Sequence, residues 1–156
     1  MPNFGYSISG LDPDKTAIAS GRDLKVSHKN TREVCNAIKG MQLESAKRFL
    51  EGVIFETQAV PFKRHKKEVG HRKGLAAQFK WPAGRYPEKS ARHVYEVISN
   101  AEANAEYKGL DTERCRIIHA AVMKGRKIKR YIERAHGRST AYFDTLTHIE
   151  IVLFEE

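Results

Sequence analysis

Two strand-like runs in the last third of the chain restrict its possible folds more than any other feature. The first, at residues 114–124, is rich in β-branched and small apolar side chains, as β-strands are. The second, at residues 147–154, alternates polar and apolar side chains, as a strand with one buried face does. Its inward face is expected to carry Ile149, Ile151 and Leu153. We therefore predict that the two runs pair as strands of a sheet packed on helices.

The segment between these runs is predicted to be a projecting β-hairpin. If both strands continue past the body toward Gly125 and Gly137, arms of about ten residues reach on the order of 30 Å. We expect the extended hairpin over residues 116–152, with its tip at about 131–137. A lone two-stranded ribbon of this length is marginally stable in water, so it requires a partner that holds it.

The positive charge of the chain is concentrated in two segments. Lysine and arginine number 28 against 19 acidic residues, which gives a net charge of +9. Residues 61–92 hold ten basic and two acidic side chains, and residues 124–138 hold seven and one. The other 109 residues carry a net charge of −5. Concentrated like charges repel one another, and a polyanion with closely spaced phosphates relieves that repulsion, so nucleic acid is the predicted partner class.

The basic hairpin segment, residues 124–138, interleaves its cations with Ile128, Tyr131 and Ile132. On a ribbon, alternate side chains would direct charges to phosphates and apolar groups to bases. This pattern indicates an element that inserts into RNA. The alternative is a charged loop that is simply solvated.

Residues 54–85 are predicted to form an extended insertion, because helical periodicity fades there and proline and glycine recur. The aromatic residues Phe62, Phe79 and Trp81 are expected either to stack on bases or to anchor the insertion to the body. His65 and His71 have no acidic or thiol partner at a helpful spacing, so no metal site is expected. The cations that would contact RNA are Lys63, Arg64, Lys66, Lys67, Arg72 and Lys73.

Three helices are expected upstream of the hairpin. The first starts after Ser27 as its N-cap and ends at Gly40; the second covers residues 43–53, with Gly52 in the stop position. The third and longest starts with Pro87 as its first residue and runs to Gly109. A loose arm, residues 1–15, leads into a first strand at residues 16–21. The prediction is one α+β domain over residues 1–156.

Other classes of function find little support in the residues. Cys35 and Cys115 cannot build a disulfide framework or a zinc site by themselves, so a reducing cytoplasm is expected. No signal peptide or membrane-length apolar run is seen. Asp144, His148 and His119 are the one tempting catalytic group, but the histidines are more simply sheet residues. We expect neither an enzyme, nor a cofactor, nor a membrane partner.

A long-range motif extends from the hairpin into the final strand. The motif begins with a basic residue, Lys129, and after four free positions continues with Arg-Ala-x-Gly-Arg at residues 134–138. After nine further free positions it ends with a histidine and alternating aliphatic residues, at residues 148–153. The pattern resembles the ribosomal protein family numbered twenty-two in the bacterial large subunit and seventeen in the eukaryotic one. Residues 37–40 with 44–46 resemble the family's first two helices, and residues 99–105 with 109–111 resemble the end of its third helix. The resemblance covers residues 16–53 and 86–154, and the insertion looks like the archaeal and eukaryotic type.

The resemblance implies a structural protein of the large ribosomal subunit. Such proteins pack three helices on a three-stranded antiparallel sheet, bind large-subunit ribosomal RNA beside neighbouring ribosomal proteins, and support its assembly, with a long protruding β-hairpin that lines the polypeptide exit tunnel. Carried over, the hairpin cations that hold RNA are Lys124, Arg126, Lys127, Lys129, Arg130, Arg134 and Arg138. The tip facing the tunnel and the nascent chain is Ile132, Glu133, Arg134, Ala135 and His136. The alternative is an RNA-processing or RNA-modifying enzyme with a basic docking hairpin, or a DNA-binding architectural protein.

Overall fold

An antiparallel sheet with strand order β1-β7-β4 organises the chain. The computed structural model describes residues 5–156, and the sheet strands are β1 (Thr16–Leu24), β4 (Cys115–Ile128) and β7 (Asp144–Glu155). The predicted pairing of the two C-terminal runs is confirmed, since β4 and β7 are antiparallel neighbours. The last strand of the sequence is therefore the central one, and its Ile149, Ile151 and Leu153 are fully buried, as the alternation predicted.

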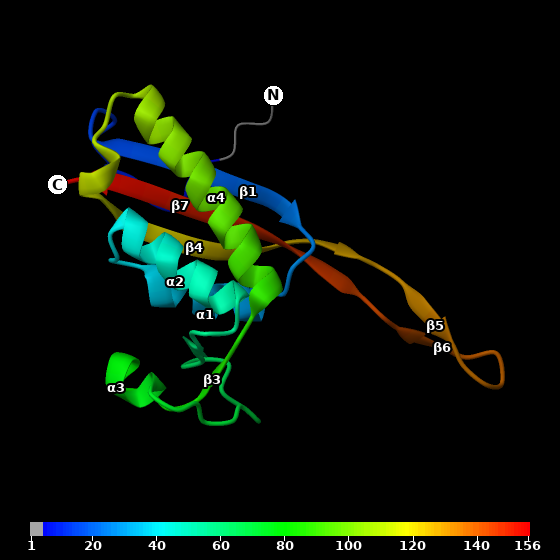
Figure 1. The fold of residues 1–156 in the computed structure, drawn as a ribbon. Helices are drawn as coiled ribbons and strands as arrows, with labels where there is room; N and C mark the ends of the chain where they lie inside the picture. Colours follow the sequence, from blue (N-terminus) through cyan, green and yellow to red (C-terminus); the bar gives the residue numbers. More distant parts are fainter. Residues whose placement is uncertain (1–4) are drawn as a thin grey trace.

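Three helices cover one face of this sheet: α1 (His28–Ile38), α2 (Leu43–Ile54) and α4 (Glu88–Tyr107) (Figure 1). Each is amphipathic, with a stripe of buried side chains at helical spacing that meets the sheet or another helix. In α4, Ala91, Ala101 and Ala105 are completely buried, so small side chains allow this helix to lie close to its neighbours. The predicted α+β class, with three helices on a three-stranded antiparallel sheet, is confirmed for the described residues.

The helix ends agree with the sequence except at two places. Ser27 precedes α1, although its side chain makes no capping hydrogen bond, and Gly40 follows it with a φ of +86°. Pro87 lies just before α4, not in its first turn. The predicted stop at Gly52 is wrong, because α2 continues to Ile54. The Gly52 carbonyl accepts hydrogen bonds from the amides of the returning residues 57 and 58, and a Cβ there would lie 3.0 Å from the Gln58 side chain.

The opposite face of the sheet is partly covered by the N-terminal arm. The expected loose arm covers residues 1–15; of these, residues 1–4 lie outside the described part of the chain. Ser7 donates hydrogen bonds from its amide and its hydroxyl to Glu150, at 3.0 and 2.9 Å. Its hydroxyl also lies 2.9 Å from Nε2 of His119. Since Glu150 points away from the helices, the arm is held against the outer face at this point.

The insertion has more structure than its composition predicted. A short antiparallel pair, β2 (Val60–Pro61) and β3 (Gly84–Arg85), closes its base, and α3 (Leu75–Phe79) adds a single helical turn. The aromatic side chains anchor it: Phe62 is 1% exposed, the Trp81 indole donates to the Phe62 carbonyl at 2.8 Å, and Phe79 packs edge-on against Phe49 of α2. Phe62 and Phe79 therefore anchor the insertion to the body, whereas Trp81 holds Phe62 from within the insertion.

The predicted hairpin projects well beyond the body (Figure 1). It leaves where the β4–β7 register shifts between Lys124 and Lys127, and the distal strands β5 (Tyr131–Glu133) and β6 (Ser139–Ala141) extend it. Gly125 allows the close approach of the His148 ring, which would lie 2.9 Å from a Cβ at this position. At the tip, His136 and Gly137 have φ values of +60° and +68°, and the Arg138 amide points back to the Ala135 carbonyl at 3.5 Å. Consecutive left-handed residues are what a tight hairpin turn requires.

One short 3₁₀ helix, η1 (Thr112–Arg114), precedes β4.

Candidate nucleic-acid interface

All thirteen cations predicted to contact RNA are exposed. Seven lie on the hairpin and six on the insertion, and the body separates neither group from solvent. Figure 1 shows the hairpin and the insertion leaving the body in different directions. Both groups of cations are therefore accessible, so one protein molecule can present them together to an extended partner.

Aromatic side chains accompany the cations along the hairpin. Tyr131 and Phe143 form an edge-to-face pair with ring centroids 5.7 Å apart, yet they remain 61% and 43% exposed. Arg130 forms an ion pair with Asp144 at 3.3 Å, and Arg134 Nε donates to the Thr140 hydroxyl at 3.2 Å. Large exposed rings between cations offer stacking surfaces next to groups that attract phosphate.

Two of the six insertion cations also hold the insertion together. Lys66 lies over the Trp81 ring at 5.2 Å. Arg72 lies over the Tyr86 ring at 5.1 Å and donates through Nε to the Gly84 carbonyl at 3.3 Å. Such cation–π contacts order the side chains while leaving the charge accessible.

The two basic segments converge at the start of α1. Burial lowers the pKa of His28, and the positive charges of Lys124, Lys29 and His65 lower that pKa further. Lys124 belongs to the hairpin and His65 to the insertion. The two adjacent residues at the start of α1 face different clusters, because His28 lines a pocket at the hairpin root and Lys29 lines a pocket beside the insertion.

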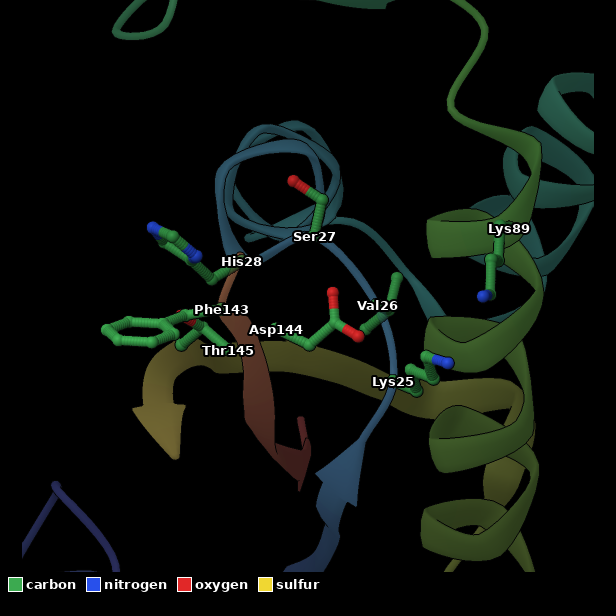
Figure 2. A pocket seen from close by; sticks show the side chains of 8 residues that line it. All are labelled: Lys25, Val26, Ser27, His28, Lys89, Phe143, Asp144 and Thr145. Carbon is green, nitrogen blue, oxygen red and sulfur yellow. The ribbon is translucent and has the colours of Figure 1, made fainter. Parts of the chain in front are cut away.

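A shallow pocket lies at the root of the hairpin (Figure 2). Figure 2 shows His28 and Phe143 on one side, Lys25 and Lys89 on the other, and the Asp144 carboxylate between them. The lining residues come from the loop before α1, the first turn of α4 and the start of β7. The Asp144 carboxylate, which pairs with Arg130, lies among these cations, so the pocket offers mixed charge beside the Phe143 ring.

A second cationic pocket lies between α1 and the insertion. Its wall from α1 carries Lys29 and Asn30. The remaining polar wall is Arg64, His65, Lys66, Lys67 and Arg85. The absence of carboxylates from this lining makes it suitable for an anion.

Sequence reasoning missed the cations that join the two clusters. Lys25, His28 and Lys29 lie in a segment whose overall charge is unremarkable, so no local count identifies them. Lys89 was counted in the basic segment 61–92, but it lies in the predicted third helix and not in the insertion. They are brought together only because the starts of α1 and α4 lie beside the hairpin root. The place of Lys89 in the basic segment 61–92 was the signal that could have identified it.

The residues considered for catalysis lie apart and have separate partners. His119 contacts Ser7, His148 accepts a hydrogen bond from the Asp23 amide at 3.0 Å, and Asp144 pairs with Arg130. Both histidines are strand residues, as expected. Among residues 5–156, no group of three or more His, Cys, Asp or Glu side chains could hold a metal ion. Within the same range, no helix is both long and apolar enough to cross a membrane.

Comparison with known proteins identifies close relatives. The family model described as "Ribosomal protein L22p/L17e" matches residues 19–154. The chain is 52% identical to large ribosomal subunit protein uL22 of Methanopyrus kandleri, covering 98% of this chain and 96% of the relative. It is 50% identical to the protein of that name from Methanocaldococcus jannaschii, covering 99% and 97%. For the Archaeoglobus fulgidus protein the identity is 49%, covering 97% and 96%.

Proposed function

The chain belongs to the ribosomal protein L22p/L17e family, and we propose on this basis that it is a structural component of the large ribosomal subunit. It binds large-subunit ribosomal RNA through the hairpin and the insertion and supports the folding of that RNA during assembly. Its place of action is the ribosome, next to other ribosomal proteins. The near-complete coverage of relatives that carry this name supports the proposal.

The observation that carries RNA binding is the surface formed by two separate basic segments. The hairpin and the insertion both expose their cations, and the start of α1 lies next to both: His28 lines the pocket at the hairpin root, and Lys29 lines the pocket beside the insertion. The residues outside these segments carry net negative charge. A surface of this kind attracts a polyanion and directs it to one side of the molecule.

The hairpin tip is proposed to line the polypeptide exit tunnel and to meet the nascent chain there. Ile132, Glu133, Arg134, Ala135 and His136 are all exposed and lie at the far end of the ribbon. Apart from Arg134, this tip carries no lysine or arginine, in contrast to the arms. Cationic arms suit contact with RNA, and a tip with fewer cations suits a position beyond that RNA, in the open space of the tunnel.

The direct test shortens the hairpin and measures RNA binding against salt. Ile128 faces Asp144 across the ribbon, so residues 129–143 can be replaced by an Asn-Gly turn that closes the shortened arms. The deletion removes Lys129, Arg130, Arg134 and Arg138. Binding to protein-free large-subunit ribosomal RNA is expected to weaken, and the salt slope to become shallower by about 0.7–0.9 for each phosphate that the shortened chain no longer neutralises.

Two outcomes would contradict the proposed function. One is an unchanged affinity and slope after the deletion, because the hairpin would then neutralise no phosphates. The other is equal affinity of the full chain for duplex DNA, because an RNA-inserting ribbon should favour folded RNA, whose grooves and loops are recognised by shape.

A further inference from the structure

A buried carboxylate on α1 binds the backbone of the basic loop of the insertion, residues 63–67. Glu33 lies in the middle of α1 and is 1% exposed. Its Oε2 accepts the backbone N–H of Lys63 at 3.1 Å. Its Oε1 accepts those of Arg64 and His65, at 3.0 and 2.8 Å.

Three consecutive amides that converge on one carboxylate form a backbone anion site, which the chain fills with its own side chain. Successive N–H groups create such concave sites in loops. A buried carboxylate is costly unless it is hydrogen-bonded, and bonds from N–H groups to an ionised acceptor are among the stronger ones. The loop and the helix therefore stabilise each other: without Glu33, three amides lose their acceptor, and without the loop, the carboxylate loses its donors.

The fixed backbone determines where the loop's cations point. With the amides of residues 63–65 turned inward to Glu33, the side chains of Lys63, Arg64 and Lys67 remain exposed. Arg64 and Lys67 line the same anion-suited pocket as Lys29, which comes from the first turn of α1. Glu33 lies one helical turn beyond Lys29 on the same helix, so one helix supplies both a pocket wall and the anchor of the opposite wall.

We propose that Glu33 is a positioning residue for RNA binding: it holds the loop of residues 63–67 so that its cations and Lys29 receive a backbone phosphate of the RNA. The inference rests on the proposed function. It adds Glu33, whose negative charge is opposite to that of the cations that contact RNA. By simple electrostatics, removal of a carboxylate should strengthen binding to a polyanion. Positioning predicts the opposite sign, because a loop that is not preorganised loses conformational freedom when it binds.

The test compares Glu33→Gln with Glu44→Gln in the full chain. Glu44 is an exposed carboxylate on α2 that pairs with Arg48, so its variant makes the same charge change away from the loop. The RNA is protein-free large-subunit ribosomal RNA of Archaeoglobus fulgidus, the source of one relative. Glu33→Gln should weaken binding roughly tenfold, the equivalent of one charge-assisted hydrogen bond, and make the salt slope shallower. Glu44→Gln should leave binding unchanged or slightly stronger.

Hydrogen exchange on the free protein tests the mechanism without RNA. The amides of residues 63–65 should exchange faster in Glu33→Gln, while those of β7 stay protected. If Glu33→Gln does not fold, Glu33→Asp replaces it, because the shorter side chain keeps the charge but cannot reach all three amides. Weaker binding with faster exchange supports positioning; binding equal to or tighter than that of the unmodified chain overturns it. Failure of the unmodified chain to bind the RNA would instead contradict the proposed function, and the exchange result would still report on the loop.

Discussion

Gly125 lies where the β4–β7 register shifts at the base of the hairpin, and it has no room for a side chain. A Cβ there would lie 2.9 Å from the His148 ring and 3.2 Å from the Leu146 carbonyl. Gly125→Ala is therefore expected to lower the free energy of unfolding by about 1–3 kcal/mol, as overpacking does. Urea unfolding measures this loss. Gly70→Ala is the matched control, since a Cβ at Gly70 meets nothing within 4 Å; equal effects of both substitutions would contradict the close approach.

His119 connects the stability of the sheet to pH. Burial lowers its pKa below the ordinary value of 6.5, and Lys39 lowers it further, while Glu150 opposes the change. The unfolded chain thus binds this proton more readily, so stability should be full above pH 6.5 and fall as the pH drops from 6.5 toward the folded pKa. His28 adds a dependence of the same sign. His119→Gln should flatten the unfolding free energy measured between about pH 5.5 and 7.5; an unchanged profile would be the contrary result.

The contacts of single residues were the hardest feature to predict from the sequence. The exposed cations could be predicted, because charge runs are visible in the sequence and the loops that carry them are exposed. The contacts of Glu33 could not, because the amides that bind its carboxylate lie 30 or more positions away in the chain. His28 was missed for the same reason, since Lys89 and Phe143 line a pocket with it only in the folded protein.

Among the elements, the hairpin arms yield a prediction about phosphate binding. Replacing Arg134 and Arg138 together by alanine should weaken RNA binding and reduce the salt slope by about 0.7–0.9 for each phosphate left without its cation. Arg48→Ala is the control, because Arg48 pairs with Glu44 on α2. Filter binding over a salt series provides the slopes. If the double variant keeps the slope of the unmodified chain, these two residues do not face phosphate.

Elements with strong periodicity could be predicted, and those defined by distant contacts could not. The three long helices and the β4–β7 pairing follow from spacing within each segment. The end of α2 was misplaced at Gly52 because that glycine serves a contact with residues 57 and 58, which outweighs its tendency to stop a helix. The β2–β3 pair joins Val60 to Arg85, and two-residue strands have too short a pattern to recognise.

For the molecule as a whole, the body should fold without the hairpin tip. Every residue of the core cluster lies outside residues 129–143. Deleting residues 132–136 should therefore change the free energy of unfolding by less than about 0.5 kcal/mol, as surface changes do. Thermal unfolding followed by circular dichroism measures this. A large loss of stability would mean that the ribbon supports the body and is not a separate projection.

In the assembled large subunit, the hairpin arms should lie among ribosomal RNA, and directed hydroxyl-radical probing can detect them there. The native thiols are buried, and burial raises the pKa of Cys35 to about 12 and that of Cys115 as well, so an iron chelate attaches at an introduced cysteine. We expect strong cleavage of the RNA from Lys129→Cys and weaker cleavage from Glu106→Cys on the exposed face of α4. Intact RNA around a chelate at residue 129, in subunits that contain the protein, would show that the hairpin does not lie among RNA.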